Sequence, residues 1–103
     1  MSKIYSINDI KNIANIVFSN TPVLEAILFG SYANGQASKN SDIDIFVKSN
    51  GVLKGLNFYG VLEDLTTKFK KNIDLIEELE IEKGSRIENE IIKQGIKIYE
   101  RRQ

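Results

Sequence analysis

The sequence contains neither cysteine nor histidine among its 103 residues. The lack of cysteine excludes disulfide bonds, thiolate zinc sites and cysteine nucleophiles. The lack of histidine excludes a Ser-His-Asp triad, imidazole metal ligands and a histidine acid–base catalyst near neutral pH. Polar chemistry therefore depends on Asp, Glu, Ser, Tyr, Lys and Arg side chains. A bound metal is expected to be a hard cation held by carboxylates, Mg²⁺ or Mn²⁺ rather than Zn²⁺.

The sequence also lacks an excess of charge of either sign and any long apolar run. Fourteen Lys and Arg residues balance fourteen Asp and Glu residues, which argues against attraction of the whole surface to nucleic acid or to an anionic membrane. No segment approaches the roughly 20 apolar residues of a membrane span, and no apolar core of a signal peptide follows the N-terminus. We therefore expect a single cytoplasmic domain over residues 1–103.

Apolar residues at three- and four-residue spacing predict helices in three segments. The first helix is expected at about residues 6–19, with Ser6 as its N-cap and Asp9 three positions later. The second is expected at about residues 53–70, with an apolar face formed by Leu56, Phe58, Leu62, Leu65 and Phe69. The third follows Ser85 and stops at Gly95, with an apolar face formed by Ile87, Ile91 and Ile92.

Short apolar or alternating runs predict strands at residues 26–29, 43–47, 73–76 and 96–99. The small, polar residues 31–40 are expected to form a loop with at most one helical turn. The acidic segment 77–82 is interpreted as a solvated face or loop. The alternation of strands and helices predicts an α/β fold in two or three layers.

Three carboxylates stand out because they lie in predicted strands. Asp42 and Asp44 are two residues apart, so their side chains share one face of a strand, where they repel each other unless a cation lies between them. Asp74 lies inside the next apolar strand, where a carboxylate is either exposed at a sheet edge or part of a site. The alternative for the pair is a solvated strand face, because Asp-x-Asp is common by chance.

A second candidate element is Gly30-Ser31, which directly follows a buried strand. Glycine lets the backbone approach a ligand closely, and free N–H groups at a following helical turn favour a phosphate. Taken alone, Gly-Ser after a strand is simply a turn. If the strands before Gly30 and after Asp42 are neighbours, however, a phosphate loop and the carboxylates meet at one end of the sheet. That arrangement is suited to phosphoryl transfer.

Together these elements resemble the signature of minimal nucleotidyltransferases in the DNA polymerase beta superfamily. The matching segments are LFGSYANG at residues 28–35, SDIDI at 41–45 and IDL at 73–75. The resemblance extends over essentially the whole chain. It implies the nucleotidyltransferase fold, an α/β architecture with a small mixed sheet of three to four strands packed with about four helices.

The resemblance also implies roles for individual residues. Gly30 and Ser31 would hold the β- and γ-phosphates of a nucleoside triphosphate, with ATP as the expected donor. Asp42 and Asp44 would ligate two Mg²⁺ ions. Asp74 would complete the metal site nearer the acceptor and help to activate an acceptor hydroxyl. The implied reaction is in-line attack on the α-phosphate with release of pyrophosphate.

The sequence departs from many such relatives at two loop positions, where Tyr32 and Asn34 replace arginine. The phosphate charge would then be met by Lys39, Lys48, Arg86 or the partner. Of these, Lys39 is the predicted nucleotide-binding residue.

Minimal nucleotidyltransferases resemble antitoxins that are paired with a HEPN-domain ribonuclease and silence it by adding AMP to a hydroxyl, typically of tyrosine. This is the leading hypothesis, with a HEPN-domain protein as the partner in a hetero-oligomer, or with the chain forming a homodimer. The HEPN ribonuclease motif needs histidine, so this chain cannot be the ribonuclease. One alternative is a catalytically weak or inactive module that acts by complex formation. Another is a transferase for a small molecule such as an aminoglycoside.

Overall fold

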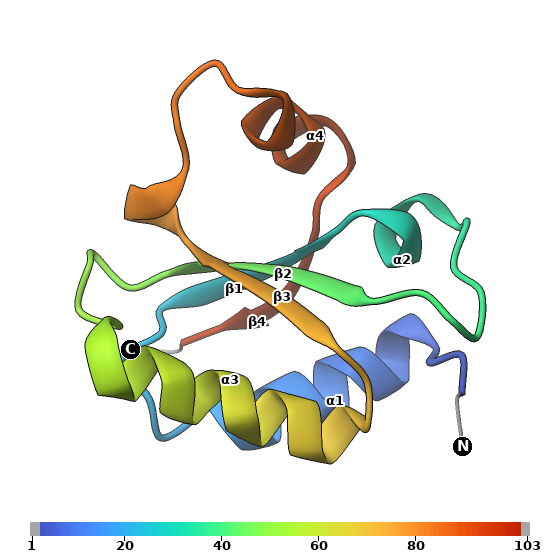
Figure 1. Cartoon of the computed structure of the whole chain (residues 1–103), viewed down its shortest axis with the longest axis horizontal. Coiled ribbons are helices and arrows are strands. Elements are labelled where there is room, and N and C mark those ends of the chain that lie inside the picture. The colour runs from blue at the N-terminus through green and yellow to red at the C-terminus, as the bar shows by residue number, and fades with distance from the viewer. Residues whose placement is uncertain (1–2, 102–103) are drawn as a thin grey trace.

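The computed structural model describes residues 3–101, which form one four-stranded sheet and its covering helices (Figure 1). The strand order is β3-β2-β1-β4. β1 pairs antiparallel with both β2 and β4, whereas β2 and β3 are parallel, so the sheet is mixed as predicted. The elements, in chain order, are α1 (Ile7–Phe18), β1 (Glu25–Phe29), α2 (Ser31–Asn34), β2 (Ile43–Lys48), α3 (Gly55–Phe69), β3 (Ile73–Glu77), the 3₁₀ turn η1 (Glu78–Glu80), α4 (Arg86–Gln94) and β4 (Ile96–Glu100).

The main core lies between the sheet and the helices α1 and α3, which run along one face (Figure 1). β2 places Ile43, Ile45 and Val47 on this face, all of them fully buried. Because successive strand residues point to opposite faces, Asp44 and Phe46 are directed to the other face. The alternation predicted from the sequence is confirmed.

α1 begins where its sequence predicts. The Ser6 side chain accepts a hydrogen bond from the Asp9 backbone N–H, and the Asp9 side chain accepts one from the Ser6 N–H. This capping box satisfies two backbone donors that the first helical turn would otherwise leave unpaired.

The predicted apolar face of α3 is wrong at its first residue. Leu56 is 89% exposed, and the buried residues of α3 are Val61, Leu65 and Phe69. At about 100° per residue, Leu56 lies about 140° around the helix from Val61. Phe58 and Leu62, nearer the buried stripe, pack partly against the core.

The second face of the sheet is covered more thinly, by α4, above the sheet in Figure 1. Ile91 is the buried contact of this helix and packs against Phe29 and Phe46, whereas Ile87 and Ile92 are 42% and 72% exposed. The predicted apolar face of α4 is therefore confirmed only at Ile91. α4 comes very close to the sheet at Gly95, where a Cβ atom would lie 2.6 Å from Cγ2 of Ile27.

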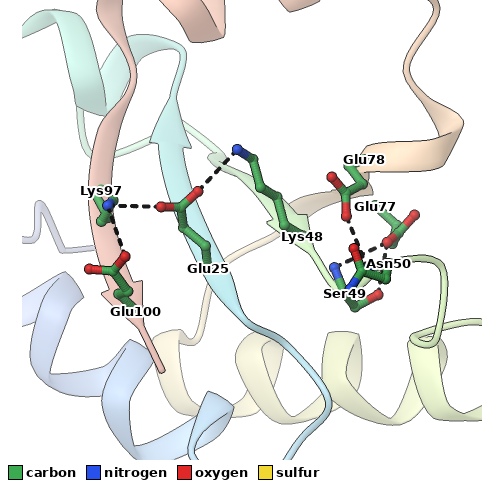
Figure 2. Close-up of polar contacts among 8 residues, drawn as sticks. All are labelled: Glu25, Lys48, Ser49, Asn50, Glu77, Glu78, Lys97 and Glu100. Carbon is green, nitrogen blue, oxygen red and sulfur yellow. Dashed lines mark hydrogen bonds and ion pairs between the residues drawn. The ribbon is translucent and has the colours of Figure 1, made fainter. Parts of the chain in front are cut away.

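The interpretation of segment 77–82 as solvated is wrong for Glu77, which is only 2% exposed. Its Oε2 accepts hydrogen bonds from the backbone N–H groups of Ser49 (3.3 Å) and Gly51 (3.0 Å) and from the Ser49 hydroxyl (2.8 Å). Its Oε1 accepts from the Leu79 N–H (2.8 Å). Figure 2 shows this carboxylate directed at the loop after β2. Because these donors replace water, Glu77 ties the end of β3 to that loop.

None of the helices within residues 3–101 combines the length and the apolar character needed to cross a bilayer.

At the far end of the sheet from α2, the Glu25 carboxylate forms ion pairs with Lys48 (3.1 Å) and Lys97 (2.8 Å), as Figure 2 shows.

Candidate functional site

The strand register brings two of the predicted carboxylates to neighbouring positions. Asp44 of β2 pairs with Phe29 of β1 on one side and with Asp74 of β3 on the other. Asp74 is exposed, because β3 is an edge strand, and Asp44 is half-buried. Asp42 is exposed and lies one residue before β2 begins. The three acids therefore lie at the end of the sheet where β1 ends and where β2 and β3 begin.

Gly30 joins this group because β1 ends beside Asp44. It adopts φ 71° and ψ −153°, and a Cβ atom there would collide with the Asp44 carboxylate. Only glycine fits this position, both because of its positive φ and because of the contact. Ser31 follows as the first residue of α2 and is half-buried. The predicted phosphate loop and the carboxylates thus lie side by side.

Burial, together with the nearby negative charges of Asp74, Asp42 and Glu90, raises the pKa of Asp44 to about 6. Glu90 comes from α4 and was not singled out by the sequence. Its only sequence signal is its place one residue before Ile91, the residue that turns α4 toward the sheet. Three carboxylates from β2, β3 and α4, with Asp42 just before β2, therefore create a negative region at this end of the sheet.

The donor chemistry of these carboxylates fits a hard divalent cation. Within residues 3–101, Asp42, Asp44 and Asp74 form no ion pair with lysine or arginine, so a metal would have no protein cation to displace. Within the same part of the chain, no group of three or more acidic side chains is already arranged to hold a metal ion. The structure thus brings Asp44 and Asp74 together, with Asp42 at the margin.

Lys39 lies in the loop between α2 and β2. It is exposed and lines a cavity of about 380 Å³ together with Asp42, Lys70 and Lys71. The loop residues Gly30 and Ser31 do not line this cavity. The structure therefore groups Lys39 with Asp42 and not with the predicted phosphate loop, and its nucleotide-binding role stays a prediction.

The loop residue Tyr32 is part of the core, because it is 5% exposed and its hydroxyl donates a hydrogen bond to the Lys3 carbonyl at 3.4 Å. Tyr32 is therefore a structural aromatic residue and does not face the acids. Asn34, the other departure from the arginine pattern, accepts a hydrogen bond from the Gln36 N–H and helps to shape the end of α2.

The sequence matches the family described as polymerase beta, nucleotidyltransferase over residues 11–103, which is most of the chain. The chain belongs to this nucleotidyltransferase family. The resemblance identified from the Gly-Ser, Asp-x-Asp and third-acid elements is thereby confirmed.

Among individual relatives in the nucleotidyltransferase family, the protein adenylyltransferase MntA of Shewanella oneidensis is 33% identical over 66 residues. The match covers 63% of this chain and 48% of MntA, so the chain spans about half the length of that relative.

Solved structures share the nucleotidyltransferase fold. A toxin–antitoxin structure with AMP-PNP contains a chain with a TM-score of 0.73 and 23% identity, covering 90% of this chain and 75% of that one. A structure of tri-AMPylated Shewanella oneidensis HEPN toxin with MNT antitoxin gives a TM-score of 0.68 and 18% identity, covering 92% of this chain and 73% of that one. At these identities the comparison establishes the common fold, and it agrees with the predicted architecture.

Proposed function

We propose that this nucleotidyltransferase moves AMP from ATP to a hydroxyl group of a partner protein in a metal-dependent reaction. The observation that carries the proposal is the position of Asp44, which is paired in register with Asp74 and in contact range of the Gly30 backbone. An acid pair beside a glycine that approaches it this closely is suited to a polyanionic substrate and its cations.

In this reaction the acceptor oxygen forms a bond to the α-phosphorus of ATP, and the bond from that phosphorus to the bridging oxygen of the β-phosphate breaks. Pyrophosphate leaves with the bond's electron pair, and the acceptor hydroxyl would lose its proton to solvent water with the help of Asp74. Gly30 and Ser31 would hold the β- and γ-phosphates, and Asp42, Asp44 and Asp74 would hold two Mg²⁺ ions. Bound Mg²⁺ neutralises charge on the leaving group and lowers the pKa of the acceptor hydroxyl.

A protein acceptor is supported by the relatives. MntA of Shewanella oneidensis is named a protein adenylyltransferase, and a related solved structure holds a tri-AMPylated HEPN toxin with its MNT antitoxin. By analogy, the proposed partner of this chain is a HEPN-domain ribonuclease, which the chain would silence by adding AMP. The balanced charge of the chain agrees with a protein acceptor rather than a nucleic acid.

The test is to mix the chain with a candidate HEPN-domain partner and with Mg-ATP, and to measure the mass of the partner. We expect a gain of one or more AMP units and loss of ribonuclease activity. An unchanged mass, with both proteins folded and in complex, would contradict the proposal.

The variant Asp42→Asn/Asp44→Asn separates transfer from simple binding. If the chain silences its partner by adding AMP, this variant binds the partner but neither modifies nor silences it. If the chain acts only by occlusion, the variant still silences it. Asp64→Asn, on the exposed side of α3, is the matched control and should behave like the wild type.

A further inference from the structure

A cavity of about 380 Å³ lies beside Asp42, between the loop that precedes β2 and the segment that joins α3 to β3. All eight residues that line it are polar or charged, and three of them are lysines: Lys39, Lys70 and Lys71. The sole acid among them is Asp42. In a chain whose formal net charge is zero, this cavity is a local concentration of positive charge, which we call the lysine cavity.

Among the described residues 3–101, no carboxylate forms an ion pair with any of the three lysines. The ion pairs found in residues 3–101 use Lys48 and Lys97 at the far end of the sheet. Lys39 and Lys70 are exposed, so their ammonium groups are free to meet a ligand. Charge that the fold does not neutralise itself is available to an anionic partner.

The shape of the lysine cavity is fixed by hydrogen bonds from its third lysine. Nζ of Lys71 donates to the carbonyl oxygens of Lys39 (2.8 Å) and Ser41 (3.2 Å), and so ties the loop before β2 to the segment after α3. The Ser41 hydroxyl accepts a hydrogen bond from the Ser38 N–H at 2.8 Å within the same loop. A wall held in place before binding reduces the entropy lost when a ligand is ordered.

The position of the lysine cavity relative to the acids indicates which substrate it meets. The candidate phosphate loop follows β1, Asp44 lies on β2 and Asp74 lies on the edge strand β3. The lysine cavity lies on the β3 side, since Asn72 and Lys71 immediately precede that strand. In an in-line displacement the attacking and leaving oxygens are on opposite sides of the phosphorus. With pyrophosphate leaving toward Gly30, the acceptor approaches over the lysine cavity.

We propose that the lysine cavity is the acceptor-docking site, and that it selects a protein segment in which acidic residues flank the hydroxyl to be modified. This inference rests on the proposed nucleotidyl transfer and adds to it the chemical class of the acceptor. Lys39 and Lys70 bind carboxylates of the acceptor, while Lys71 acts as a positioning residue that shapes the cavity.

The lining favours a peptide over a single-stranded nucleic acid. Sequence-tolerant recognition of unpaired bases relies on aromatic side chains on which the bases stack, and the lysine cavity has no aromatic residue among its eight lining residues. Its amide and hydroxyl groups, from Asn40, Ser41, Thr66 and Asn72, can bind backbone and carboxylate groups of a peptide.

The test uses two tyrosine peptides of equal length, one with Asp and Glu around the tyrosine and one with Asn and Gln in their place. Binding of each fluorescent peptide is measured by anisotropy without nucleotide, and transfer of AMP is measured with Mg-ATP. The wild type should bind the acidic peptide more tightly, by up to about fivefold for each lysine–carboxylate pair, since one exposed charge pair contributes up to about 1 kcal/mol. The double variant Lys39→Gln/Lys70→Asn should lose this preference. Asn is chosen at residue 70 because it tolerates the left-handed φ of 55° found there.

The matched control is Lys68→Gln, which removes a lysine from the exposed side of α3 outside the cavity. It should retain the preference for the acidic peptide. In the transfer assay the double variant should raise KM for the acidic peptide, whereas Lys68→Gln should not.

The outcomes distinguish the inference from the proposed function. Transfer to both peptides with equal efficiency would overturn the lysine cavity as acceptor site while keeping nucleotidyl transfer. Tighter binding of a single-stranded oligonucleotide than of the acidic peptide would replace the protein acceptor with a nucleic acid. Charge-selective binding that the double variant abolishes, without transfer to any acceptor, would support the docking site and refute the transferase.

Discussion

Both ends of the parallel β2–β3 pair carry carboxylate side chains, but the carboxylates at the two ends differ in their contacts with the rest of the protein. At the beginning of the strands, Asp44 and Asp74 are register partners, and neither forms an ion pair with a lysine or arginine in the part of the chain that the structure describes. At the end of β3, Glu77 accepts four hydrogen bonds from the loop after β2 and from η1. Carboxylates that accept hydrogen bonds from the protein's own donors stabilise a fold. Neighbouring carboxylates without such donors repel each other, and this arrangement favours binding of a cation from solution.

The pKa values express the same contrast. Burial and neighbouring acids raise the pKa of Asp44 to about 6. Burial alone would raise the pKa of Glu77 as well, but the hydrogen bonds from Leu79, Ser49 and Gly51 outweigh burial and lower it. The fold therefore favours the charged form of Glu77 and disfavours the charged form of Asp44.

The largest expected effect is a loss of AMP transfer at the beginning of β2 and β3, where Asp44 lies. Asp44→Asn should reduce AMP transfer by at least about 100-fold, because Lewis-acid stabilisation of the reacting phosphate amounts to several kcal/mol. The same change should leave the free energy of unfolding equal or higher, because it removes a repelled charge. Parallel transfer assays and urea unfolding would check this. A large loss of stability would remove the contrast between the two ends.

At the end of β3, where Glu77 accepts its hydrogen bonds, the expected effect is on the free energy of unfolding. Glu77→Gln replaces a buried acceptor of four hydrogen bonds with a neutral amide and should lower the free energy of unfolding by about 2 kcal/mol. Urea unfolding at neutral pH measures it. Glu80→Gln, on the exposed part of η1, is the matched control and should change stability by less than about 0.5 kcal/mol.

The lowered pKa of Glu77 also predicts a pH dependence of known sign. A carboxyl whose pKa is lower in the folded than in the unfolded chain contributes stability that is present above its ordinary value of 4.5. That stability is lost as the pH falls through the lower, folded value. The difference in unfolding free energy between the wild type and Glu77→Gln should therefore be constant from pH 7 to about 5 and then shrink. A difference that grows in acid would contradict the lowered pKa.

The smallest effect on stability is expected for Glu25, a carboxylate that is paired with exposed lysines. Glu25 is paired with Lys48 and Lys97, whose side chains are 44% and 49% exposed. Exposed ion pairs contribute less than about 1 kcal/mol and weaken with salt. Glu25→Gln should therefore reduce stability slightly at low ionic strength and hardly at all in 1 M salt. An effect as large as that of Glu77→Gln would show that exposure does not separate the two.

Local signals explain how much of the fold was predictable. Three of the features that the sequence reveals directly act over only a few residues. They are the capping box of Ser6 and Asp9, the alternation from Asp42 to Val47, and the apolar run around Asp74. The Gly-Ser and Asp-x-Asp elements located the candidate site for the same reason. The assigned roles of those residues remain predictions that the variants above test.

What the sequence did not reveal depends on distant partners. Glu77 looked solvated because its donors at Ser49 and Gly51 are 28 and 26 residues away. Glu90 gave no signal, since its approach to Asp44 depends on how α4 lies over the sheet. Leu56 was misplaced because the helical spacing of apolar residues fits more than one face, and packing against the core selects among them.

α4 buries few apolar side chains against the second face of the sheet, and this affects how readily α4 unfolds locally. Ile91 is the one buried residue among the nine of α4, whereas α1 buries Ile10, Ala14, Val17 and Phe18. Local stability follows buried apolar contact, so amide protons of α4 should exchange with deuterium faster than those of α1. When α4 opens, Glu90 moves away with it and the field at Asp44 becomes less negative. The electrostatic environment of the acids is thus tied to the least protected helix that covers the sheet.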